Sequence, residues 1–203
     1  MTTRTTSAPA VSIERVADQA RWPVVDSLLR EYLPWALERF RTRHDVHFDD
    51  ADAEMDRHHA SFAADMPRLL AAPGRLLIAH LHGKPAGMIA LKPVHACAPQ
   101  AHRGVGEIKR MFVRTAARGQ GIGRTLMHRL LADARAEGFQ TLRLETLSFM
   151  TEARALYRSV GFVDVPAFVE LPADRPDIAR VLRFMALTLQ PQGHTPAVAQ
   201  ALA

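Results

Sequence analysis

The stretch RGQGIG, residues 118–123, decides the fold of this chain and marks its first ligand site. It follows the apolar segment Glu107–Val113 and opens an amphipathic helix. Three glycines at alternate positions leave a backbone with no side chains in the way of a ligand. The start of a helix supplies unpaired N–H groups, and the positive end of its dipole favours an anion. The sequence therefore predicts a loop that holds phosphate groups.

Two well-known phosphate loops do not fit this stretch. A dinucleotide fingerprint requires a glycine at the sixth position from Gly119, where this chain has Arg124. A P-loop requires Lys and then Ser or Thr after its last glycine, and Gly123 is again followed by Arg124. What remains is an Arg-x-x-Gly-x-Gly pattern between a strand and a helix. A tight turn without a ligand is the alternative, but a simple turn rarely needs three glycines.

Hydrophobic periodicity and turn residues predict an α/β domain around this loop. We expect helices over Gln19–Phe40, from the capping residues Asp49 and Asp50 to Leu70, from Ile122 to Gly138, and over Thr151–Val160. Pro34 is expected to kink or split the first helix. Strands are expected over Ser12–Val16, Arg75–Leu81, Ala86–Lys92, Glu107–Val113, Thr141–Leu147, Phe162–Val169 and Val181–Leu189. This order places helices on a central sheet.

Length and composition indicate one soluble domain. The chain has 203 residues, of which 48% are hydrophobic, and contains no stretch of 18 apolar residues. Residues 11–189 are expected to form the domain, and residues 1–10 and 190–203 to be flexible tails. The single cysteine, Cys97, excludes an intrachain disulfide. Together with the absence of a secretory signal, this predicts a cytoplasmic protein without a membrane segment.

The net charge of +5 raises the question of nucleic-acid binding. Only 6% of the residues are aromatic, and they do not interleave with the basic ones, so nucleic acid is the less favoured partner. The basic residues concentrate instead around the glycine loop: Arg103, Lys109, Arg110, Arg114, Arg118, Arg124 and Arg129. A solvated basic face explains several of them. A polyphosphate needs positive potential at the same place.

The pattern resembles the GNAT acetyltransferase superfamily, whose signature is Gln or Arg, two residues, Gly, one residue, then Gly or Ala. Arg118, Gly121 and Gly123 match that signature. The preceding EIKRMFV also matches, and LRLET followed by EARALYRSVGF resembles the second conserved segment of the family. The resemblance implies a mixed, mostly antiparallel sheet of about six to seven strands. Four helices flank such a sheet, which is splayed between its fourth and fifth strands.

In that family, the backbone of this loop holds the pyrophosphate of acetyl-coenzyme A, and the strand before the loop pairs with the pantetheine arm. The resemblance therefore implies acetyl-coenzyme A as co-substrate. The residues it assigns to coenzyme binding are Met111, Phe112, Val113, Arg118, Gly119, Gln120, Gly121, Ile122, Gly123, Arg124 and Thr125.

Acetyl transfer from a thioester to an amine needs a base, a stabilised oxyanion and a leaving thiolate. Tyr157 resembles the family's tyrosine that protonates the thiolate, although a core tyrosine is the alternative. The family often has Asn at the position of Met150, so that coenzyme contact is in doubt here. Cys97 has no partner base nearby in the sequence, and we interpret it as incidental.

Two glutamates are candidate bases. Glu107 stands where some histone-type members of the family have their general base, and Glu145 lies on the next strand. For Glu107 the alternative is a salt bridge to Lys109 or Arg110. In the family a bulge splays the two strands and opens a wedge for the thioester. The resemblance implies that the N–H group of Val113 polarises the thioester carbonyl there.

Histidines and acids near the second predicted helix raise a metal hypothesis. His44, His47, His58 and His59 flank acids, but their spacing is irregular, so no metal site is predicted. The acidic run Asp49, Asp50, Asp52, Glu54 and Asp56 fits either a helix N-terminus or an acidic rim that attracts a cationic amine.

Together, these observations predict an acetyl-coenzyme A-dependent N-acetyltransferase that transfers acetyl directly to a primary amine. The expected acceptor is a small molecule or is amino-acid-like. The alternatives are a non-catalytic acyl-coenzyme A-binding module and a protein or peptide N-acetyltransferase. The identity of the acceptor and the pairing of two copies into a homodimer are left open by the sequence.

Overall fold

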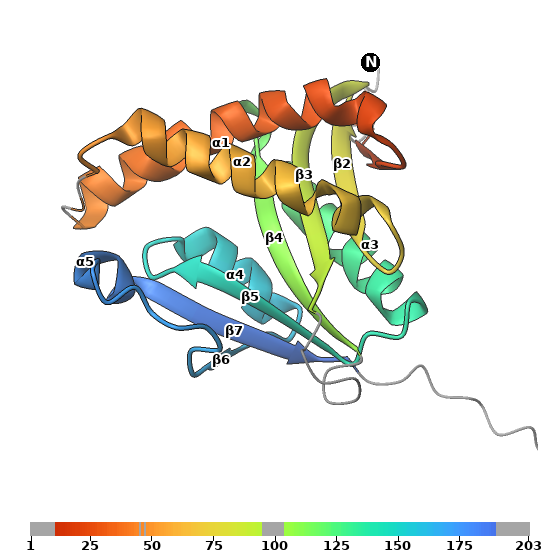
Figure 1. Ribbon diagram of the computed structural model, residues 1–203. Helices are drawn as coiled ribbons and strands as arrows, with labels where there is room; N and C mark the ends of the chain where they lie inside the picture. The colour runs from red at the N-terminus through yellow and green to blue at the C-terminus, as the bar shows by residue number, and fades with distance from the viewer. Residues whose placement is uncertain (1–10, 45, 47, 95–103, 190–203) are drawn as a thin grey trace, which may run out of the picture.

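A seven-stranded sheet in the order β1-β2-β3-β4-β5-β7-β6 runs through the molecule (Figure 1). The computed structural model describes residues 11–44, 46, 48–94 and 104–189. Its strands are β1 (Val11–Arg15), β2 (Arg75–Leu81), β3 (Lys84–Pro93), β4 (Val105–Val113), β5 (Thr141–Leu147), β6 (Val163–Val165) and β7 (Leu182–Thr188). The expected tails and Cys97 lie outside the described residues.

Four long helices cover the sheet, as predicted: α1 (Trp22–His44), α2 (Ala51–Leu70), α3 (Ile122–Ala136) and α4 (Thr151–Ser159). A four-residue helix, α5 (Pro176–Ala179), and two 3₁₀ turns, Gln19–Arg21 and Thr115–Ala117, complete the described elements. Helix α1 continues through Pro34, so of the two effects expected there, a kink or a split, the split does not occur. The strand expected over Phe162–Val169 is shortened to the three residues of β6.

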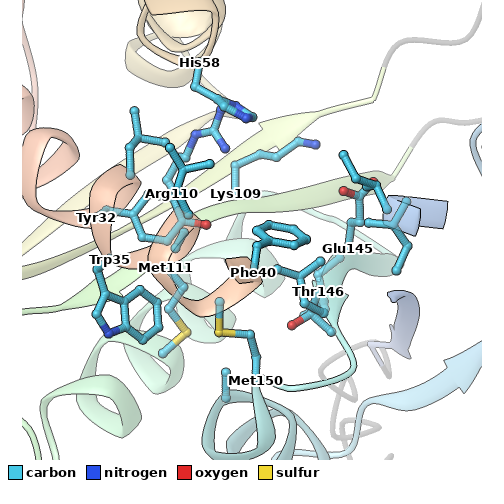
Figure 2. Close-up of a pocket in the computed structure, with 18 of the residues that line it drawn as sticks. Tyr32, Trp35, Phe40, His58, Lys109, Arg110, Met111, Glu145, Thr146 and Met150 are labelled. Atoms are coloured by element: carbon cyan, nitrogen blue, oxygen red, sulfur yellow. The ribbon is translucent and has the colours of Figure 1, made fainter. Parts of the chain in front are cut away.

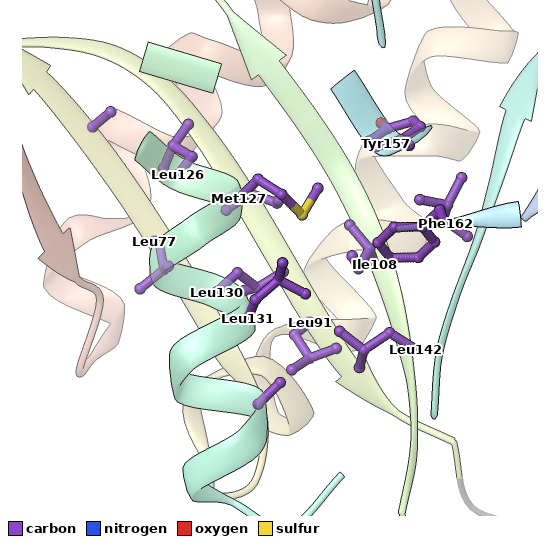
Figure 3. Packing of buried hydrophobic residues seen from close by; sticks show 14 of the residues in the cluster. Leu77, Leu91, Ile108, Leu126, Met127, Leu130, Leu131, Leu142, Tyr157 and Phe162 are labelled. Atoms are coloured by element: carbon purple, nitrogen blue, oxygen red, sulfur yellow. The ribbon is translucent and has the colours of Figure 1, made fainter. Parts of the chain in front are cut away.

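Alternate side chains of the strands build two hydrophobic layers. On β2, Leu77 packs on one face with the leucines of α3, while Leu76 and Ile78 pack on the other face with α1 and α2. Figure 3 shows Leu126, Leu130 and other α3 side chains directed at the sheet, with Tyr157 and Phe162 in the same layer. The sheet is thereby covered on both sides, and the functional groups are left at the edges of its strands.

The separation of β4 from β5 is the feature that positions the site. The two strands pair in parallel only from Val105 and Thr141 to Ile108 and Leu144. Beyond that point they diverge, as Figure 1 shows. The other described pairings in the sheet are antiparallel. The predicted mostly antiparallel sheet, splayed between its fourth and fifth strands, is therefore confirmed.

A β-bulge coincides with this divergence. Opposite β3, Ala90 aligns with Lys109 and Met88 with Phe112, so β4 carries an extra residue between them. Arg110 lies in this bulge with a φ of 52°, a left-handed conformation that is uncommon outside glycine. A bulge bends its strand and increases its twist. It therefore accounts for the turning of β4 away from β5.

Among the helices that the structure describes, none combines the length and the apolar character needed to cross a membrane.

Candidate active site

The glycine loop lies between the end of β4 and the start of α3, as predicted. Gly121 is the N-cap of α3 with a φ of 76°, and its carbonyl oxygen accepts from the Thr125 N–H at 3.0 Å. A Cβ atom built on Gly119 or Gly121 would meet no heavy atom within 4 Å. On Gly123 it would lie 3.3 Å from Met111 Cε. The first two glycines thus keep a space open, and the third allows close packing.

That space forms the mouth of a pocket of about 440 Å³, here called the loop pocket. Its lining comprises Trp35, Arg39, Met111, Phe112, Val113, Ala117, Arg118, Gly119, Gly121, Ile122, Gly123, Met150, Glu152, Ala153 and Leu156. Eight of the eleven residues assigned to coenzyme binding belong to it. Gln120, Arg124 and Thr125 are exposed and do not line it.

Helix α1 contributes Trp35 and Arg39 to the loop pocket. The sequence did not indicate either residue. The Arg118 and Arg39 guanidinium groups lie over the Trp35 ring, with their carbons 4.4 and 5.0 Å from its centroid. Arg118 Nε also donates to the Val113 carbonyl oxygen at 3.1 Å. Burial and the neighbouring Arg39 lower the pKa of Arg118. Two guanidinium groups thus crowd together beside the glycines, which indicates a site that favours an anion.

The end of β4 turns backbone groups towards the wedge between the strands. The Arg114 N–H donates to Ala86 on the β3 side at 2.8 Å. Backbone directions alternate along a strand, so the N–H and C=O groups of Met111 and Val113 face the opposite, open edge. The Arg118 contact to the Val113 carbonyl is consistent with this direction. This edge is available to pair with an extended ligand.

A second pocket, here called the wedge pocket, has a volume of about 330 Å³ and occupies the space between the diverging strands. Figure 2 shows His58 and Arg110 at one end and Trp35, Met111 and Met150 at the other, with Glu145 to the side. The two pockets share the wall residues Trp35, Met111, Met150 and Ala153. Met150, where the family often has Asn, is buried at this junction. The glycine loop and the wedge therefore border two adjacent cavities that share one wall.

Tyr157 lines the wedge pocket and is 6% exposed. Its ring packs against Phe162, with centroids 6.0 Å apart, so this side chain belongs to the hydrophobic core and also lines the pocket. Burial raises the pKa of the Tyr157 phenol, and Tyr32 adds to that effect. The phenol therefore keeps its proton at neutral pH.

The two candidate glutamates have different surroundings. Glu145 lines the wedge pocket, and reduced hydration there raises the pKa of its carboxyl, with a further contribution from Glu107. Glu107 is buried outside that lining, paired with Lys109 and, at 3.2 Å, with Arg143. These cations outweigh burial and lower the pKa of Glu107. The structure thus brings Glu145, not Glu107, together with Tyr157 in the pocket.

Arg110 heads a chain of polar groups across the wedge pocket. Its Nη2 lies 3.3 Å from His58 Nδ1, and His58 Nε2 lies 3.0 Å from Glu54 Oε1. Burial lowers the pKa of His58, and Arg110 lowers it further, so the imidazole is neutral at pH 7. In this arrangement His58 donates to Glu54 and accepts from Arg110. Each of these residues stands out in the sequence, but their contact, which joins β4 to α2, has no signal there.

The residues of the acidic run Asp49, Asp50, Asp52, Glu54 and Asp56 do not all lie in the same place. Asp50 caps α2, accepting from the Ala53 N–H at 2.9 Å, whereas Glu54 lines the wedge pocket. Within the described part of the chain, no group of three His, Cys, Asp or Glu side chains is placed to hold a metal ion. His47 of the metal hypothesis lies outside the described residues.

Comparison with known proteins identifies the class. The Acetyltransferase (GNAT) family model matches residues 26–162, which include the glycine loop, both strands of the wedge and Tyr157. The chain therefore belongs to this family and is an acyltransferase. A protein of Azospirillum brasilense named IAA acetyltransferase is 36% identical over 118 residues, which cover 55% of this chain and 73% of that protein.

Solved structures share the fold. The paia N-acetyltransferase from Thermoplasma acidophilum, solved in complex with coenzyme A, aligns with a TM-score of 0.66 and 14% identity. The alignment covers 89% of this chain and 99% of that chain. Salmonella typhimurium yncA, solved with its cofactor acetyl-CoA, aligns with a TM-score of 0.59 and 20% identity, covering 93% and 99% of the two chains.

The buried tyrosines lead to a spectroscopic prediction. The chain has two tyrosines, and burial raises the pKa of both Tyr32 and Tyr157 above the usual 10.0. Absorbance at 295 nm should therefore show no tyrosinate as the folded protein passes pH 10, whereas the denatured protein should show two. Burial favours the neutral phenols, so the stability they contribute is complete below the unfolded pKa and is lost as the pH rises towards the folded pKa. Two tyrosinates forming near pH 10, with the circular dichroism unchanged, would contradict this site geometry.

Proposed function

We propose that this protein is an acetyl-coenzyme A-dependent N-acetyltransferase that transfers acetyl directly to a primary amine. The proposed acceptor is a small molecule or is amino-acid-like. One observation carries the proposal: the loop pocket and the wedge pocket share four wall residues. The glycine loop, which we assign to phosphate binding, therefore lies next to a cavity lined by the Glu145 carboxyl and the Tyr157 phenol. The single cysteine of the chain supports a cytoplasmic location.

The residues of the loop pocket fit coenzyme A. A Cβ at Gly119 or Gly121 would project into open space, which is where a diphosphate would need room. The first amides of α3 have no partner within the helix, so they are free to donate to phosphate oxygens. Arg39 and Arg118 add positive charge at the same place. The open edge at Met111 and Val113 suits the amide groups of the pantetheine arm.

The wedge pocket supplies the groups that acyl transfer needs. Acetyl-coenzyme A, when bound, supplies the acetyl group as a thioester. Glu145 serves as the base that removes a proton from the acceptor ammonium, since a raised carboxylate pKa makes a better base near neutral pH. The Val113 N–H faces the open edge and stabilises negative charge on a carbonyl oxygen. As the C–S bond breaks, Tyr157 donates its proton to the departing sulfur and takes one back from the nitrogen that has formed the new C–N bond.

Glu107 takes a different part in this proposal. It is held between Lys109 and Arg143, and its carboxylate lowers the cost of keeping those cations half-buried beside the wedge. Its lowered pKa also makes it a weaker base than Glu145. We therefore assign Glu107 to positioning the start of the two diverging strands and Glu145 to proton removal.

A thiol-release assay tests transfer against the alternative of a non-catalytic binding module. With acetyl-coenzyme A and a panel of small primary amines, the wild-type protein should release free thiol in an amount equal to the acetylated amine. Tyr157→Phe removes the proton donor and should lower kcat by about 10²–10⁴-fold, with little change in coenzyme affinity. Coenzyme binding without turnover of any amine would favour the module.

Substitution of Gly121 tests the coenzyme site. Gly121→Val places a branched side chain in the open space of the loop and should weaken coenzyme A binding by about 10- to 100-fold, measured by calorimetry. Gly83 in the β2–β3 turn is a matched control, because its φ of 75° and open surroundings equal those at Gly121. Both variants should lose similar stability, roughly 1–2 kcal/mol, but Gly83→Val should keep full affinity. Equal affinity of the two variants for coenzyme A would show that the glycine loop is not part of the coenzyme site.

A comparison of the two glutamates tests the assignment of the base. Activity should fall as the pH drops through the raised pKa of Glu145, because the carboxylate is the active form. Glu145→Gln should lower kcat/KM by about 10²–10⁴-fold and abolish this acidic limb of the pH profile. Glu107→Gln leaves Lys109 and Arg143 without their carboxylate, so it should lower thermal stability while keeping the limb. If Glu107→Gln abolished the acidic limb and Glu145→Gln kept it, Glu107 would be the base.

A further inference from the structure

Some charged side chains of the wedge pocket have an oppositely charged partner, and others do not. Lys109 pairs with Glu107, and Glu54 with Arg57 and His58. Among the residues that the structure describes, Arg110 and Glu145 are the pocket's charged side chains with no oppositely charged partner within 4.0 Å. One positive and one negative charge thus remain in a single cavity of about 330 Å³. An occupant that carries both charges would complement them.

The backbone holds Arg110 in an unusual conformation. Arg110 has a φ of 52° in the bulge and is the second residue past the last β4–β5 pair. A non-glycine residue in this region is strained and persists only where its surroundings enforce it. The contact from Nη2 to His58 Nδ1, with Glu54 behind the imidazole, fixes the guanidinium over the wedge pocket. The bulge and the contacts to His58 and Glu54 together direct the Arg110 guanidinium at the cavity.

His58 does not neutralise this cation. A neutral imidazole that donates to Glu54 accepts one hydrogen bond from Arg110 and leaves the net positive charge in place. A guanidinium carries five N–H donors, and its planar fork matches the two oxygens of a carboxylate. Because the Glu145 carboxylate lies in the same cavity and interacts with Arg110, a singly charged anion matches the guanidinium better than a phosphate does.

We propose that the acceptor is an amino acid whose carboxylate is bound by Arg110, with its amine directed at Glu145 and Tyr157. His58 is a positioning residue in this assignment, acting through Arg110. The inference rests on the proposed acetyl transfer, since it concerns the acceptor of that reaction. It adds a specificity determinant: the pocket selects amines that carry an anionic group over neutral amines of the same shape.

Matched acceptor pairs test this assignment. L-methionine and L-phenylalanine are each compared with their own carboxamides, and kcat/KM is measured for all four. A carboxamide also changes the amine pKa, so the informative quantity is the change in the acid-to-amide ratio between wild type and variant. Arg110→Gln should reduce that ratio by about 10- to 100-fold, the range expected for a charged hydrogen bond, while the KM for acetyl-coenzyme A stays unchanged. Arg110→Lys, which keeps the charge without the fork, should reduce it less.

Arg30→Gln is the matched control. Arg30 lies on the exposed face of α1, paired with Asp26 at 2.7 Å, so this change removes the same charge outside the pocket. The ratio should stay at the wild-type value. An unchanged ratio in Arg110→Gln would overturn the proposal and leave Arg110 with a purely structural role beside His58. If Arg110→Gln does not fold, the same acid-to-amide ratio is measured in Arg110→Lys.

A binding measurement separates this inference from the transfer reaction itself. Calorimetry compares N-acetyl-L-methionine with N-acetyl-L-methioninamide. The acid should bind at least about tenfold more tightly to the wild type, and Arg110→Gln should abolish the difference. Amine turnover with no preference for the carboxylate in either assay overturns the Arg110 assignment and leaves acetyl transfer intact. Arg110-dependent binding of the acid without turnover of any amine supports the anion site and overturns the proposed transfer.

Discussion

The parting of β4 from β5 after Ile108 and Leu144 is the constraint on which the rest of this structure depends. Two parallel strands that stay paired hydrogen-bond each other's backbone N–H and C=O groups and leave no space between them. Here the bulge at Arg110 turns β4 away, and the last five residues of β4 and last three of β5 lose their shared hydrogen bonds. The cavity, the free backbone edge and the exposed carboxylate of Glu145 are all consequences of that parting.

Burial then decides the chemistry of each group along the wedge. Tyr157 packs in the core layer beside Phe162 and so keeps its proton, while Glu145, in the same pocket, is only partly dehydrated. An acid and a base with separated pKa values are thus placed in one cavity. Glu107 is two residues before Lys109 on the same strand, but its cation partners keep it ionised and away from the pocket.

Local patterns made much of this predictable from the sequence. The glycine loop and the spacing from Tyr157 to Phe162 lie within short segments, where backbone geometry follows from residue type. The salt bridge from Glu107 to Lys109 was one of the alternatives drawn from strand periodicity, and it is present. Trp35 and Arg39 were missed, because only the path of α1 across the sheet brings them to the loop pocket. The contact between Arg110 and His58, 52 residues apart, likewise has no local signal.

The choice between a kinked and a split helix at Pro34 was left open for a related reason: packing of Leu33 and Ala36 against the fold outweighs the local cost of the proline. A crystal structure with coenzyme A would show whether the wedge joins a coenzyme site to an acceptor site. We expect the diphosphate on the amides that begin α3, the pantetheine arm along Met111–Val113, and the sulfur between Glu145 and Tyr157. Coenzyme bound elsewhere, or β4 and β5 hydrogen-bonded along their full length, would contradict this expectation.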